Sequence, residues 1–95
     1  MRFDTGHVDV PSAGTAVRLL NSSDKVLWIR IKAETGTIYV GRSDVSATNG
    51  YPVTTAAGID VEFDFGQYGG SVLMSDFFVD AASSGDNATW AAIFK

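Results

Sequence analysis

The chain has no cysteine, two prolines and one histidine among its 95 residues. The lack of cysteine excludes disulfides, thiol nucleophiles and zinc sites built on thiolates. Basic residues are also scarce, with 7 lysine and arginine residues against 11 aspartate and glutamate residues and a formal net charge of −4. Nucleic-acid binding depends on basic residues that neutralise phosphates, so we expect no nucleic-acid partner.

Long apolar runs are missing as well. No stretch of the chain approaches the roughly 18 consecutive apolar residues of a membrane-spanning helix, and the first residues have no apolar segment of signal-peptide length. We therefore expect no membrane partner and a protein made in the cytoplasm without export. Hydrophobic residues make up 45% of the chain and charged residues 19%, which is a globular composition for one small domain.

Apolar residues recur with a period of two almost throughout, which predicts an all-β fold. In the clearest strand, residues 59–65, apolar odd positions alternate with the carboxylates of Asp60, Glu62 and Asp64. Lys25–Lys32 is a second expected strand. Its pattern places Leu27, Ile29 and Ile31 on one face and Val26, Trp28, Arg30 and Lys32 on the other.

Expected strands recur about every 8 to 12 residues with turn segments between them. This spacing predicts a single-domain antiparallel β-sandwich, Greek-key or jelly-roll-like, of about seven to eight strands and no helix. Residues 1–15 are assigned to an N-terminal arm or first strand, and residues 16–95 to the sandwich domain. Within the first segment, His7–Pro11 fits either an additional strand or an arm lying across a neighbour.

Two clusters contain side chains of the types that carry out chemistry. Asp60, Glu62 and Asp64 have the rough separation of glycosidase carboxylates, but side chains on one strand point in parallel and form neither a cleft nor a converging calcium site. His7 and Asp9 share a face, yet one histidine makes neither a zinc site nor a catalytic triad in a chain without a serine elbow. We therefore expect no enzyme activity, no cofactor and no metal.

Aromatic side chains are numerous, with six phenylalanines, three tyrosines and two tryptophans. Most are expected in the core of a sandwich. Phe77 and Phe78 are adjacent, so one of them must leave the core unless a bulge intervenes. Tyr51 and Tyr68 lie in expected loops beside glycines. These positions predict an apolar contact surface, which suits a protein partner better than a sugar ring.

The segment Ile38–Val53 resembles a block found in small structural proteins of tailed bacteriophages. In that block an aromatic-Val-Gly unit ends a strand and is followed by Ser-Asp-Val, by Thr or Ser residues and by Asn-Gly, which here are Tyr39-Val40-Gly41, Ser43-Asp44-Val45, Ser46-Ala47-Thr48 and Asn49-Gly50. The resemblance extends over Ala16–Lys95, and Arg42 replaces the small residue of similar chains. In physical terms, we expect Asp44 to accept backbone N–H groups and both glycines to allow positive φ.

The resemblance implies a virion component. We expect a capsid decoration or cement protein that binds the major capsid protein on the outer capsid surface and stabilises the head, as a homo-oligomer with a trimer favoured. The alternative is a carbohydrate-binding or host-adhesion module of a head fibre or tail, with Tyr51, Tyr68 or Trp90 as a stacking platform. Residues 1–3 are expected to precede the first strand as a clamp. The expected interface residues are Met1, Arg2, Phe3, Arg42, Tyr51, Tyr68 and Phe78.

Overall fold

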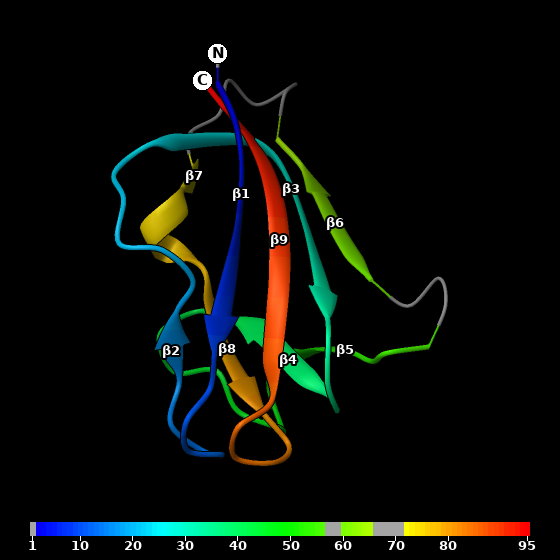
Figure 1. Cartoon of the computed structure of the whole chain (residues 1–95). Coiled ribbons are helices and arrows are strands. Elements are labelled where there is room, and N and C mark those ends of the chain that lie inside the picture. Colours follow the sequence, from blue (N-terminus) through cyan, green and yellow to red (C-terminus); the bar gives the residue numbers. More distant parts are fainter. Residues whose placement is uncertain (1, 57–59, 66–71) are drawn as a thin grey trace.

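The computed structural model describes residues 2–56, 60–65 and 72–95, and it is a sandwich of two antiparallel sheets (Figure 1). The all-β, single-domain sandwich expected from the sequence is confirmed, with nine strands in the described residues instead of seven to eight. One sheet has the order β1-β9-β3-β6, with β7 also paired to β3, and the other has the order β2-β8-β4-β5. The first sheet contains β1 (Arg2–Asp9), β3 (Lys25–Ala33), β6 (Val61–Asp64), β7 (Val72–Leu73) and β9 (Asn87–Phe94). The second contains β2 (Val17–Arg18), β4 (Ile38–Gly41), β5 (Tyr51–Val53) and β8 (Phe78–Ala81).

The core lies between the two sheets and is built from alternate residues of their strands. In β9, Ala88, Trp90, Ala92 and Phe94 are buried, whereas the residues between them are half-buried. Ile29 and Ile31 of β3 are fully buried, as their spacing predicts. Because Trp90 is only 5% exposed, its expected role as a sugar-stacking platform is wrong.

The N-terminal segment is a strand of the sheet. β1 pairs with β9 over its whole length, from Arg2 opposite Phe94 to Asp9 opposite Asn87. The expectation that residues 1–3 form a clamp ahead of the first strand is therefore wrong for Arg2 and Phe3, and Met1 lies outside the described residues. Polar residues and a central glycine weaken the strand signal of β1, but the long strand β9 supplies a continuous hydrogen-bonding partner.

The face assignment of β3 is wrong at its beginning because the strand contains a bulge. Val26 lies opposite Phe94 and Trp28 opposite Ile93, so Leu27 is an additional residue on the β3 side. A bulge shifts the alternation of side chains by one position. Val26 is consequently fully buried, although the regular alternation placed it on the outer face.

The chain leaves the extended conformation soon after it enters β7. β7 ends at Leu73, and Met74–Asp76 form one turn of 3₁₀ helix. The carboxylate of Asp76 accepts the backbone N–H of Leu73 at 3.0 Å, which stabilises the start of this turn. The alternation in β6 is confirmed, since Val61 is buried and Glu62 is exposed.

Candidate functional site

The expected interface residues do not form one surface. Arg42 and Phe78 both line an open groove at one side of the sandwich. Phe3 and Tyr51 are the two large apolar residues that are strongly exposed in the described part of the chain, and they lie on outermost strands of different sheets. Tyr68 falls outside the described residues. The sequence therefore identified two members of a groove but did not indicate which residues complete it.

Aromatic rings from three elements line this groove, which has a volume of about 790 Å³. Phe63 and Phe65 are stacked side chains of the β6 segment, with ring centroids 6.2 Å apart. Phe77, next to the 3₁₀ turn, lies 5.9 Å from the Phe63 ring and 6.2 Å from the Phe65 ring. Phe63 and Phe65 are only half-buried, so the pattern that placed them in the core is correct about their face and overstates their burial. We call this site the aromatic groove, and its lining includes Arg18, Val40, Arg42, Phe63, Phe65, Val72, Phe77 and Phe78.

Two arginines lie at the aromatic groove. The Arg18 guanidinium sits 5.1 Å from the centre of the Phe78 ring, within the range of a cation–π contact. One Arg18 amino group also donates to the Asn21 side-chain oxygen at 3.4 Å. Arg42, which follows β4, is exposed. The carboxylate of Asp76 also lines the groove, so the groove combines an apolar floor with two arginines and one acidic residue, on a protein whose net charge is −4.

The loop between β4 and β5, which contains Arg42, is fixed by side chains other than the expected Asp44. Within the described residues the side chains of Ser46, Thr48 and Asn49 make its side-chain hydrogen bonds, and the carboxylate of Asp44 takes no part in them. Neither Gly41 nor Gly50 has positive φ. A Cβ at Gly50 would lie 2.6 Å from Tyr39 Cβ, 2.7 Å from Val45 Cγ2 and 2.9 Å from the Ser46 carbonyl oxygen, so close packing on three sides is what favours glycine here.

The outer face of the five-stranded sheet carries a second aromatic surface. Phe3 is opposite Ile93 on β9, and Ile93 is opposite Trp28 on β3. Phe3 is 64% exposed, and the other two side chains are half-buried. These three residues form an apolar row across three strands. The row includes Trp28 and Ile93, which the sequence analysis did not select, because pairing across strands cannot be read from one strand alone.

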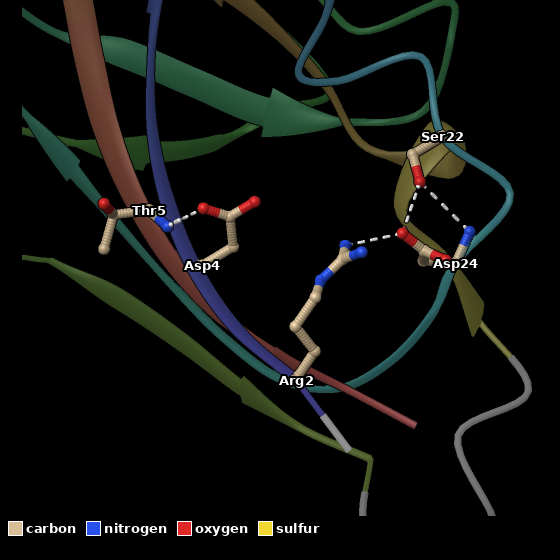
Figure 2. Close-up of polar contacts among 5 residues, drawn as sticks. All are labelled: Arg2, Asp4, Thr5, Ser22 and Asp24. Carbon is tan, nitrogen blue, oxygen red and sulfur yellow. Dashed lines mark hydrogen bonds and ion pairs between the residues drawn. The ribbon is translucent and has the colours of Figure 1, made fainter.

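Arg2, one of the expected interface residues, makes contacts within the chain. Figure 2 shows its guanidinium bonded to the Asp24 carboxylate at 2.6 Å, while the Ser22 hydroxyl donates to the same carboxylate oxygen at 2.9 Å. The hydrogen bond from Ser22, and then that from Arg2, lowers the pKa of Asp24 below its ordinary value. The Arg2 guanidinium also lies 4.8 Å from the centre of the buried Phe94 ring. Arg2 thus ties β1 to the segment before β3.

The acidic residues near β6 are partly neutralised. Arg30 of β3 contacts the Asp60 carboxylate at 3.2 Å and the Glu62 carboxylate at 3.3 Å. His7 and Asp9 do share a face, with a contact of 2.9 Å between the imidazole Nε2 and a carboxylate oxygen. In residues 2–56, 60–65 and 72–95, no group of three or more His, Asp or Glu side chains is placed to hold a metal ion.

Comparisons with known proteins add no identification: no family model, curated protein or solved structure matches this chain. The described residues contain no helix long and apolar enough to cross a membrane. The aromatic rings of the groove can bury apolar groups of a partner, and its arginines can attract a negative group.

Proposed function

We propose that this chain is a non-catalytic binding module of a virion, a decoration protein that attaches to the outside of a capsid. The observation that carries the proposal is the aromatic groove, in which four phenylalanine rings meet two arginines. Rings of this kind bury large apolar area at low entropic cost and dominate the energetics of protein interfaces. The partner proposed for the groove is a segment of the major capsid protein that carries apolar side chains next to a carboxylate.

The two arginines of the groove, against the single carboxylate of Asp76, support a carboxylate-bearing partner. Arg42 is exposed and belongs to the segment that resembles phage structural proteins. Because similar chains have a small residue at this position, Arg42 would adapt the groove to the partner of this particular protein. Electrostatic complementarity of this kind mainly sets which partner is selected and how fast it associates.

Co-sedimentation of the purified protein with heads assembled from the accompanying major capsid protein tests the proposal. Arg42→Glu should weaken binding at least tenfold and leave the melting temperature unchanged, because Arg42 is exposed. Lys32→Glu is the matched control, since it makes the same charge change on an exposed side chain of β3, which does not line the groove. Equal binding by both variants would reject the groove as the docking site, and no binding by the unaltered protein would reject a decoration role.

A second candidate function, recognition of a carbohydrate by a fibre or tail module, is favoured by the apolar row on the outer sheet face. Trp28 lies half-exposed beside Ile93 on a sheet, where an aromatic ring can stack on a sugar. A glycan array with the unaltered protein and a Trp28→Ala variant tests this function. Glycan binding that depends on Trp28 would support it, and no bound glycan would remove it.

A further inference from the structure

β1 is a long sheet edge. It contains eight residues and, among the residues that the structure describes, has a neighbouring strand, β9, on one side only. The other outermost strands of the two sheets, as far as the structure describes them, are much shorter, with two residues in β2, three in β5 and four in β6. An edge strand presents unpaired N–H and C=O groups that can hydrogen-bond to another strand.

One hydrogen bond shows which backbone groups of β1 point outward. The Thr5 N–H donates to the side chain of the preceding residue, Asp4, at 2.9 Å (Figure 2), although Thr5 lies opposite Ala91 of β9. This N–H therefore takes no part in the ladder with β9. Backbone groups in an antiparallel pair alternate between the two sides of a strand, so those of Phe3, Thr5 and His7 all point away from β9.

We propose that this edge is filled by β1 of a second copy of the chain, paired antiparallel about a two-fold axis with Thr5 opposite Thr5. Phe3 of each copy then lies opposite His7 of the other. All three positions present outward N–H and C=O groups, so the pairing forms about six backbone hydrogen bonds. It joins the two five-stranded sheets into one continuous sheet.

The side chains of β1 favour this register over its neighbours. On the outer face it places the exposed Phe3 ring against an imidazole and threonine against threonine, and cross-strand pairs of both kinds are stabilising. On the other face Asp4 lies opposite Gly6. Moving the axis to Gly6 would place Phe3 opposite the Asp9 carboxylate, and moving it to His7 would leave Phe3 without a partner within β1.

The edge is exposed, and the Asp4 side chain competes with a second strand for one of its backbone N–H groups. Phe3 is 64% exposed in the single chain, and the paired strand would cover it. The Asp4 carboxylate occupies the Thr5 N–H and must release it before the second strand binds. A two-fold pairing uses the edge of both copies and closes at two, so it predicts a dimer where the sequence analysis favoured a trimer.

Sedimentation equilibrium of the whole chain over a wide concentration range tests this pairing. We expect a monomer–dimer equilibrium that Thr5→Pro weakens at least tenfold without lowering the melting temperature, because the N–H that proline removes is not part of the β1–β9 ladder. Phe3→Ser should also weaken the dimer at least tenfold. Tyr51→Ser, which removes an exposed aromatic ring from β5, should leave it unchanged. Asp4→Ala should tighten it severalfold by freeing the Thr5 N–H.

Several outcomes would overturn the proposal: a monomer at all concentrations, a trimer, or a dimer that Tyr51→Ser weakens as much as Phe3→Ser does. If Thr5→Pro fails to fold, amide hydrogen exchange of the unaltered protein decides instead. The amides of Phe3, Thr5 and His7 should then become more protected as concentration rises, and unchanged protection would reject the pairing. These measurements need no capsid, so their failure would leave the groove proposal untouched.

Discussion

The contact between Gly6 and Trp90 gives the sharpest test of how β1 is held in the sandwich. These residues lie opposite each other on β1 and β9, on the face that looks into the core. A Cβ at Gly6 would lie 2.6 Å from Trp90 Cε2 and 2.8 Å from Trp90 Nε1, and real Cβ atoms do not approach other atoms so closely. Gly6→Ala must therefore displace either the indole or β1.

The cost of Gly6→Ala follows from the burial of the indole. Trp90 is 5% exposed, so its ring has little room to move. An additional methyl group in a closely packed core typically costs about 1 to 3 kcal/mol. Alanine loses less backbone entropy than glycine when it folds into a strand, and this offsets the destabilisation by up to about 1 kcal/mol. We expect a net loss of about 1 to 2 kcal/mol, or a melting temperature roughly 4 to 16 °C lower for a domain of this size.

Urea denaturation followed by circular dichroism measures this loss, and a double-mutant cycle assigns it to the indole. Trp90→Phe removes the ring atoms that the new Cβ would meet, so Gly6→Ala should cost clearly less in that background than in the unaltered protein. Thr5→Ala, at the exposed neighbouring position, is the control and should stay within about 0.5 kcal/mol. A Gly6→Ala protein as stable as the unaltered one, or a cost independent of Trp90, would refute the reasoning.

Phe94→Ala should destabilise the fold by about 3 to 5 kcal/mol because the ring is 1% exposed, whereas Glu62→Ala should stay within about 0.5 kcal/mol; equal effects in urea denaturation would contradict the assigned faces. Deleting residues 1–6 should lower the melting temperature of the isolated domain, because it removes most of β1 and the Arg2–Asp24 contact; an unchanged melting temperature would restore the view of a free arm. Asp24 has a pKa lowered from its ordinary value of 3.8 in the folded state, so its carboxylate stabilises the fold above that value, and this contribution disappears as pH falls through the lower folded pKa. Asp24→Asn should therefore reduce stability at neutral pH but not at strongly acidic pH, and a pH-independent difference between the two proteins would argue against this role.

The composition and the period-two pattern were sufficient to predict an all-β sandwich. Alternation is a local property, so the apolar face of a strand such as β6 can be predicted from the sequence of that strand alone. The same alternation gave a wrong face for Val26 of β3, because a bulge at Leu27 turns the Val26 side chain into the core. A bulge depends on the partner strand, and no pattern within β3 specifies it.

The candidate site was less accessible to sequence reasoning. The sequence points to Arg42 because this residue replaces the small residue of similar phage proteins. It points to Phe78 because two adjacent phenylalanines cannot both face the core of a regular strand. The tertiary structure brings both residues to the same groove. Phe63 and Phe65 were assigned to the core from their alternation alone. Their half-exposure fits the position of β6 as the outermost strand of its sheet, and strand periodicity carries no information about that position.

The N-terminal segment shows most clearly what the sequence determines and what only the tertiary structure decides. By itself the sequence determined that residues 2–9 are mostly polar and interrupted by Gly6, which left both a strand and an arm open. Only the tertiary structure decided for the strand, because β9 provides eight paired positions and the indole of Trp90 fills the space above Gly6. Contacts between segments that are distant in the chain stabilise this strand, and those contacts exist only once the sheet has formed.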